Sequence, residues 1–435
     1  MENTANILSE KTSVRRACII AVVMFITMVA HYIFKTGISG LLVKAFTAMK
    51  MPWLQIADAI VGFIIIGYLF YMRTSRYRFS RAVVIISITV AIGLCILSAF
   101  IHPGATNKPV LFMLGLAVNM LVYTATYCSW MLLVTTAFER NWLTLSIVGT
   151  GAQLGVLVGS WAGKTLAVPG FIRYLPGTIG VLYVCIFLLL GISIKKFSCG
   201  GIVLSNSSNN SIVVRNRLLL WARGIMKQYQ HNTNSYIILI LSLILTASIF
   251  GQTLNWRLQL MADYKTTVAA ASNFLGDFYQ AMAIIALIVQ IVITPLMLRY
   301  IPSYAGMLLQ PFLGILLAVL IQGNIATNIG LAGMVIFSSL DYTVYYAYKE
   351  RLWLHVPLFN KVYHKAYAGL LIPKLAALIN AASVLLLASH NFSIWVNYVI
   401  VIVLLWMVAT MVVIWTNTKY SRSGITDYKS SINEV

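Results

Sequence analysis

Acidic residues are scarce in this chain: its 435 residues include only 10 Asp and Glu, against 31 Lys and Arg. Charged residues of both signs make up 9% of the sequence, and hydrophobic residues make up 60%. A soluble protein has roughly a quarter of its residues charged. This composition excludes a soluble globular class and indicates a membrane protein.

Catalytic and metal-binding motifs are also missing. The sequence has no H-E-x-x-H, no G-x-S-x-G, no Walker A lysine loop and no metal-spaced histidine cluster. None of its five cysteines forms a C-x-x-C pair, so we expect neither a disulfide framework nor a metal site. We therefore expect no enzyme, no cofactor and no ATP-driven pump within this chain.

Long apolar runs recur along the whole sequence. Each run is close to 20 residues, which is long enough to cross about 30 Å of hydrocarbon. The pattern predicts an all-α polytopic membrane protein with about twelve transmembrane helices. The expected spans are 17–34 (continuing to about 43), 53–72, 82–101, 110–137, 143–167, 177–194, 235–256, 272–298, 304–322, 325–347, 367–389 and 394–416.

One long polar segment, residues 195–233, interrupts the apolar runs near the midpoint. It carries six basic residues and no acid. We interpret it as a basic cytoplasmic linker between two six-helix bundles, 1–194 and 234–435, which is the organisation of many secondary transporters. Part of it, RLLLWARGIMKQY, is expected to lie as an amphipathic helix on the anionic inner leaflet.

The placement of basic residues predicts the orientation. Cytoplasmic loops are enriched in Lys and Arg. If both termini are cytoplasmic, the inside segments hold 22 of the 31 basic residues. The same bias explains the net charge of +21 without a nucleic-acid partner. We expect a multi-pass protein of the bacterial inner membrane, whose partners are the lipid bilayer and a small solute; a monomer is compatible with this expectation.

Ionisable residues within the spans are the candidates for function, because a charge in hydrocarbon is costly unless it is paired or hydrated. We assign substrate binding to Lys35, Lys374, Arg257 and Tyr346, and ion pairing or proton coupling to Asp58, Asp277 and Asp341.

Two pairings among these residues are open: Lys35 with Asp58, and Lys374 with Asp341. The alternatives are a snorkelling Lys35, an interfacial Asp58 or Asp277, and a purely structural pair between Asp341 and Lys374. The tyrosines around Tyr346 could stack on a planar ligand or belong to an interfacial aromatic belt.

A glycine stripe runs through the fifth expected span. Gly151, Gly155, Gly159 and Gly163 are spaced four apart, so they share one helix face. Such a smooth face predicts close contact with another helix.

Two segments, FERNWLTLSIVGTGAQLGVLVGSWAG and YKERLWLHVPLFNKVYHKAYAGLLIPKLAALINA, resemble the bacterial and plastid ATP/ADP translocases and their wider bacterial relatives. The features that carry the resemblance are Lys349–Glu350, Trp353, Pro357–Leu358, Lys361, Lys365 and Lys374. The region FKTGISGLLV departs from the family, which has a charged stretch there. The resemblance implies a major-facilitator-like fold, alternating access and a nucleotide or similar phosphorylated solute.

The sequence as a whole predicts a secondary active transporter of a small anionic metabolite. The excess of positive charge among the span residues favours an anion, because a fixed cation in a low dielectric attracts phosphate or carboxylate strongly. The alternatives are a proton-coupled carrier of another organic anion, such as a metallophore, and a membrane scaffold or sensor that does not transport.

Overall fold

A computed structural model describes residues 2–72, 76–99, 108–134, 142–168, 170–197, 231–322, 327–353 and 358–433. Within these ranges the elements are helices joined by short turns, with no strand. Consecutive elements continue one another to give twelve helical rods in the described residues, which confirms the expected all-α polytopic architecture.

Six rods precede the central polar segment. Their elements are α1 (Glu2–Ile33) continuing through the π-helix η1 (Phe34–Ile38) into α2 (Ser39–Phe46), α3 (Met51–Met72), α4 (Arg76–Ser98), α5 (Lys108–Val134), α6 (Trp142–Leu166), and α7 (Leu175–Phe197) after the short η3 (Ile172–Tyr174).

Six further rods follow it. Their elements are α9 (His231–Asp263), α10 (Val268–Ile288) continuing through the π-helix η4 (Val289–Ile293) into α11 (Thr294–Tyr300), α12 (Ser303–Gln322), α13 (Thr327–Leu340) with the π-helix η5 (Asp341–Tyr345) and α14 (Tyr346–Leu352), α15 (Leu358–Ser383) with the π-helix η7 (Val384–Ala388), and α16 (Phe392–Asn433).

The rods are apolar enough for a bilayer. Six described helical runs are both long and hydrophobic enough to cross a membrane: Ala17–Phe46, Ile172–Leu190, Ser235–Asp263, Val268–Tyr300, Ala368–Ala388 and Phe392–Thr416. Four shorter apolar helical stretches add to them: Met51–Gly67, Ser87–Ser98, Lys108–Val122 and Tyr304–Leu320. Large apolar side chains face outward along many of these helices, as lipid contact requires.

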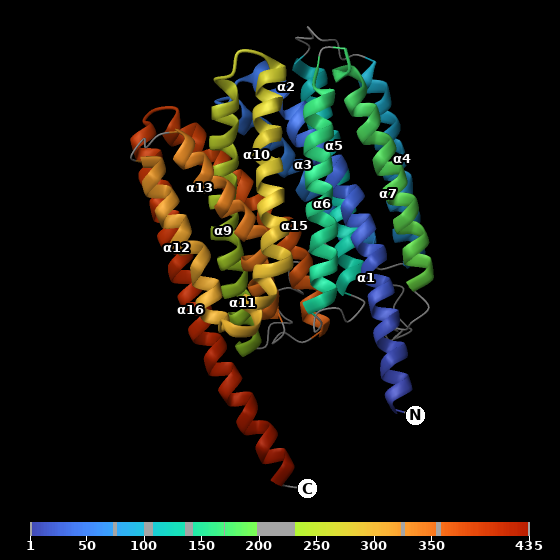
Figure 1. Cartoon of the computed structure of the whole chain (residues 1–435), viewed down its shortest axis with the longest axis vertical. Coiled ribbons are helices and arrows are strands. Elements are labelled where there is room, and N and C mark those ends of the chain that lie inside the picture. Colours follow the sequence, from blue (N-terminus) through green and yellow to red (C-terminus); the bar gives the residue numbers. More distant parts are fainter. Residues whose placement is uncertain are drawn as a thin grey trace, which may run out of the picture.

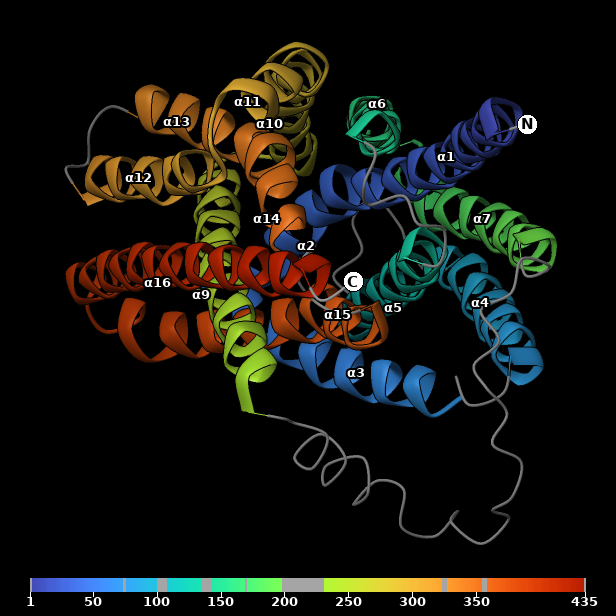
Figure 2. The ribbon, with the colours of Figure 1, turned by 90° about the horizontal axis from the view of Figure 1, so that it is seen from below.

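The rods stand side by side, and α1 begins at the same end of the molecule at which α16 finishes (Figure 1). We call this the termini end and the opposite end the far end. Seen from the termini end, α1 and α3–α7 gather on one side and α9–α16 on the other (Figure 2). The predicted linker lies almost wholly outside the described residues, at 198–230, as does its expected amphipathic helix.

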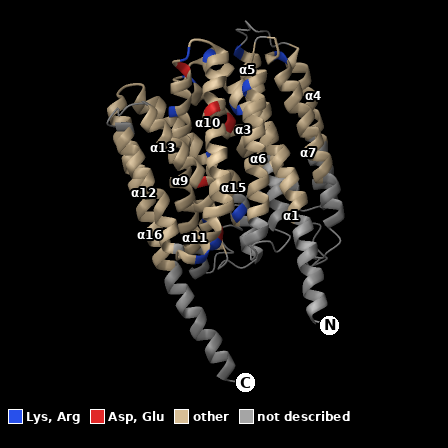
Figure 3. Ribbon diagram, viewed as in Figure 1, with Lys and Arg blue, Asp and Glu red and all other residues tan. Residues whose placement is uncertain are grey.

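Contacts between helices follow this division. In the first half α1 packs on α6 and α4 on α7, and in the second half α9 packs on α15 and α16. The two halves meet chiefly where α6 lies against α10 and where α3 lies against α15. Charged residues are sparse along the rods, with a few between the two ends (Figure 3).

The glycine stripe on α6 forms the closest helix contact in the first half, as the sequence predicted. A methyl group added at Gly151 would lie 2.7 Å from the carbonyl oxygen of Ala21, and one at Gly159 would lie 2.6 Å from that of Val29. Gly155 faces the Phe25 carbonyl still more tightly. The backbones of α1 and α6 therefore touch, and only glycine permits this approach.

Replacing Gly155 by alanine is expected to lower the melting temperature of the purified protein in detergent. The added methyl group cannot enter the contact without moving α1, and overpacking of this kind costs about 1–3 kcal/mol. Gly93→Ala is the matched control, because nothing lies within 4 Å of a methyl group there. Equal melting temperatures for the two variants would contradict the close contact.

Candidate functional site

Two adjoining cavities lie between the halves. Their volumes are about 220 Å³ and about 260 Å³. They share five lining residues: Lys35, Gln252, Asn255, Tyr279 and Pro373. Because η1, α9, α10 and α15 supply these residues, both halves of the chain build the site.

Lys35 lies where the two cavities meet. Its side chain projects from η1, where Ser39 N–H donates to Phe34 O, five residues back instead of four. The ammonium lies 5.3 Å from the ring centre of Tyr32 and 5.5 Å from that of Tyr279. No described carboxylate lies within 4 Å of it. Lys35 is thus a cation inside the protein that has aromatic faces but no counter-ion.

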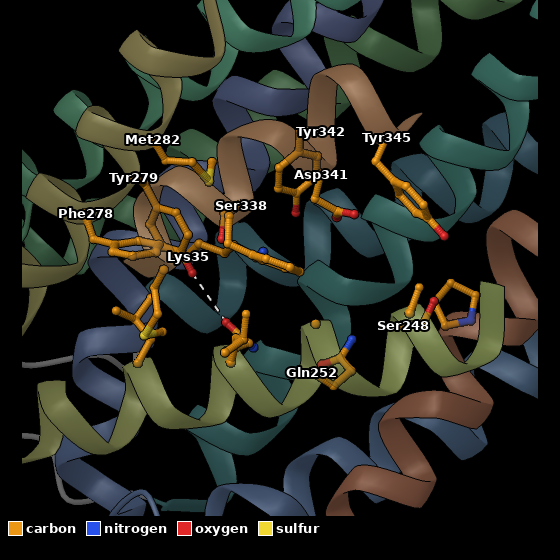
Figure 4. A pocket seen from close by; sticks show the side chains of 18 of the residues that line it. Lys35, Ser248, Gln252, Phe278, Tyr279, Met282, Ser338, Asp341, Tyr342 and Tyr345 are labelled. Atoms are coloured by element: carbon orange, nitrogen blue, oxygen red, sulfur yellow. Dashed lines mark hydrogen bonds between the residues drawn. The ribbon is translucent and has the colours of Figure 1, made fainter. Parts of the chain in front are cut away.

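The second half contributes another π-helical turn, η5, to the site. Asp341, Tyr342 and Tyr345 all line the first cavity from this turn (Figure 4). Tyr345 is fixed by Trp406, whose indole N–H donates to its hydroxyl at 3.0 Å. Tyr342 is 46% exposed although it lies in the middle of a rod, because it faces the cavity. Single π turns are frequent at functional sites, and here two of them supply the charged residues.

Polar groups of α9 form another wall of the same cavity. Ser248, Gln252 and Asn255 lie along this wall, and the Tyr279 hydroxyl donates to Asn255 Oδ1 at 3.4 Å (Figure 4). Phe278 and Tyr279 of α10 supply ring faces. The cavity therefore offers charge, amide groups and aromatic surface together.

An ion pair between the halves forms part of the second cavity. The Lys374 ammonium on α15 donates to Asp58 Oδ2 on α3 at 2.5 Å. Gly62 makes room for it, because a methyl group there would lie 3.0 Å from Lys374 Cδ and Cε. The two pairings that the sequence suggested, Lys35 with Asp58 and Lys374 with Asp341, are both wrong, because Lys374 pairs with Asp58. The actual pair links residues 316 positions apart, which sequence spacing does not encode.

Three other residues singled out in the sequence lie elsewhere. Asp277 is exposed and pairs with Lys164 of α6. Arg257 lies over the Phe392 ring, 5.3 Å from its centre. The Tyr346 ring lies 5.3 Å from the Lys349 ammonium. None of the three lines either cavity, and their assigned roles remain predictions.

Sequence reasoning missed the neutral half of the site. Gln252 and Asn255 stand three apart within the apolar run IFGQTLNW, so they share one face of α9. That spacing could have marked them. Tyr279 gave no such signal, because tyrosine is common in these spans, whereas Tyr342 belongs to the tyrosine cluster around Tyr346 that the sequence singled out for possible stacking on a planar ligand.

At the far end a polar contact closes the two halves over the site. Asp263, the last residue of α9, accepts a hydrogen bond from Ala48 N–H at 2.8 Å, and its carbonyl oxygen accepts one from Lys44 at 2.5 Å. Trp256 donates from its indole to Ala48 O at 3.1 Å. The turn that these groups hold contains Thr47 at a φ of 63°, an uncommon conformation for a β-branched residue.

Comparisons with known proteins identify the fold and not the family. No family model matches the chain, and no curated protein matches it. Among solved structures, FucP, a Major Facilitator Superfamily transporter in the outward conformation, aligns with a TM-score of 0.56 over 92% of this chain and 98% of its own, at 10% identity.

The chain has a major-facilitator-like fold. A second match, a variant of the E. coli fucose:proton symporter FucP, has a TM-score of 0.53 at 12% identity and covers 91% of this chain and 98% of its own. The fold that the translocase resemblance implied is thereby confirmed. Membership of the ATP/ADP translocases themselves stays a prediction.

The Lys374–Asp58 pair allows a direct test of its structural role. Removing one partner leaves a buried charge without its counter-ion, which costs about 3–5 kcal/mol. Asp58→Leu and Lys374→Met are each expected to lower the melting temperature of the purified protein, whereas the double variant is expected to recover much of the loss. If the two losses simply add in the double variant, the residues are not coupled.

Proposed function

We propose that this protein is a secondary active transporter that carries a small anionic solute across the membrane by alternating access. One observation carries the proposal: Lys35 has no carboxylate within 4 Å among the described residues, and it opens on a cavity between two helical halves. The fold supports the transport class, since the matched structures are transporters.

Electrostatics supports an anion as the solute. An unpaired ammonium inside a membrane protein costs several kcal/mol, and a bound carboxylate or phosphate recovers that cost. The Tyr32 and Tyr279 faces hold the ammonium in place without neutralising it. The matched symporter carries fucose, a neutral sugar, so the choice of an anion rests on Lys35 and not on the comparison.

The contacts between the halves support alternating access. The Asp263 contact closes the far end, while the central cavities remain between the halves. We place the termini end in the cytoplasm of a bacterial cell, on the strength of the basic loops. In this orientation the far end is the outer gate, and the described arrangement is closed to the outside. The translocase resemblance further suggests that the solute is a nucleotide or another phosphorylated compound.

Lys35→Gln is expected to reduce uptake by reconstituted vesicles at least about tenfold, because a truncated partner of a charge-assisted contact costs about 2–5 kcal/mol. The assay uses labelled nucleoside monophosphates, sugar phosphates and carboxylates with the full chain. Lys265→Gln is the control, since Lys265 is exposed and stacks on Phe274 away from the cavities. Uptake that is unchanged in Lys35→Gln would refute the assignment, and no uptake of any compound by the parent protein would favour the scaffold or sensor alternative.

Proton coupling is a second candidate, favoured by the position of Asp58. Its carboxylate joins the two halves through Lys374, so a proton on Asp58 would release that link. Asp58→Asn is expected to abolish acceleration of uptake by an inward proton gradient while solute exchange across the vesicle membrane continues. Gradient-driven uptake that survives in Asp58→Asn would exclude this carboxylate as the coupling site.

A further inference from the structure

Among the acidic side chains that the structure describes, Asp341 is the one that forms no ion pair with a described residue. The structure describes the side chains of five acidic residues, and four of them form ion pairs: Asp58 with Lys374, Asp263 with Lys44, Asp277 with Lys164, and Glu350 with Lys365. Asp341 has no described basic partner within 4 Å. In a chain so poor in acids, an unpaired carboxylate inside a rod calls for a ligand.

Asp341 faces the same cavity as Lys35 (Figure 4). The only other lysine that lines this cavity, Lys349, places its ammonium near the rings of Tyr345 and Tyr346, 5.9 Å and 5.3 Å from their centres. The described residues provide no hydrogen-bond donor to the Asp341 carboxylate either. The charge of Lys349 acts on Asp341 from a distance, but no described residue forms a direct polar contact with the carboxylate, which faces the cavity.

The cavity thus holds two charges of opposite sign, one from each half, that form no ion pair with the described residues. Lys35 and Asp341 project from π turns, η1 and η5, and they form no ion pair with each other. A simple anion would form an ion pair with Lys35 and leave Asp341 without one. A ligand that carries both charges compensates both residues at once.

The α9 wall of the same cavity suits the middle of such a ligand. Ser248, Gln252 and Asn255 provide hydroxyl and amide groups that can both donate and accept hydrogen bonds. Phe278 and Tyr342 add ring surface for an apolar side chain. An amide link flanked by an apolar group matches this lining.

We propose that the solute is a small zwitterion of the short-peptide type, with its carboxylate on Lys35 and its ammonium on Asp341. This proposal rests on the proposed transport function and refines its substrate class: the solute keeps the carboxylate for Lys35 and adds an ammonium, so that it carries no net charge. It also gives the two halves a shared ligand, because each half contributes one of the two charged contacts.

The test uses three forms of one dipeptide and the purified full-length protein. Glycylphenylalanine is the zwitterion, its N-acetyl form keeps only the carboxylate, and its C-terminal amide keeps only the ammonium. We expect calorimetry to give a Kd for the zwitterion at least about tenfold lower than for either capped form, because each capping removes one charge-assisted contact. Equal affinity for the N-acetyl form would overturn the proposal, and absence of binding by the zwitterion would overturn it as well.

Two variants assign the two ends of the ligand. Asp341→Asn should erase the preference for the zwitterion over the N-acetyl form, and Lys35→Gln should erase the preference over the amide. Asp427→Asn, on the extension of α16 beyond Thr416, is the acid control and should keep both preferences. A loss of both preferences in either single variant would indicate a disturbed cavity and would overturn the assignment of ends.

Vesicle uptake separates failure of this inference from failure of the transport proposal. Uptake of the N-acetyl form that depends on Lys35 and equals that of the zwitterion would refute the zwitterion and leave the anion transporter standing. If no compound, including the phosphorylated panel, enters vesicles in a Lys35-dependent way, the transport proposal itself fails.

Discussion

The constraint on which this structure depends is that a charge placed within hydrocarbon must find a partner. Of the four ion pairs described, three join the first half of the chain to the second: Lys44 with Asp263, Lys164 with Asp277, and Lys374 with Asp58. Only the pair between Lys365 and Glu350 lies within one half. Three of the five acidic side chains that the structure describes thus lie in ion pairs where the halves meet. An interface held by ion pairs can open to water at little cost, because water solvates the separated charges, whereas an interface of the same size made of leucine would lose its burial.

Contacts within each half are of the opposite kind. The α1–α6 contact is backbone against backbone along the glycine stripe, and the second half is filled by large rings such as Trp256, Trp395 and Trp406. Packing of this density changes in discrete steps and does not deform smoothly. The two densely packed halves therefore meet at an interface that carries three of the four described ion pairs. Dense packing within each half and ion pairs between the halves are what a rocking mechanism requires, and both follow from the positions of the glycines, aromatic residues and acids in the sequence.

Sequence reasoning predicted the features that depend on local pattern. The number of spans, the glycine stripe and the position of Lys35 and Lys374 inside the helical bundle all follow from hydrophobic runs, fixed spacing and the cost of buried charge. Partners could not be predicted, since nothing local links Lys374 to an aspartate 316 residues away. Two helices also run beyond the predicted spans: α9 continues to Asp263 and α16 to Asn433, whereas the apolar runs end near 256 and 416. The polar residues there keep helical backbone, so hydropathy marks the expected span and not the helix.

The π turns explain why the two unpaired charges lie where they do. In η1 and η5 a backbone N–H bonds to the carbonyl five residues earlier, which inserts one extra residue into the helix and shifts the faces of the residues beyond it. Each turn lets an otherwise apolar rod present a short polar face to the centre without turning its neighbours toward lipid. Such turns are less favourable than regular helix, and the charges they expose are costly as well. Neither cost benefits the empty protein, since closer ion pairing would stabilise it more. Under the proposed function both costs are recovered when a ligand occupies the cavity, and the two π turns are then the part of the protein that contacts the solute.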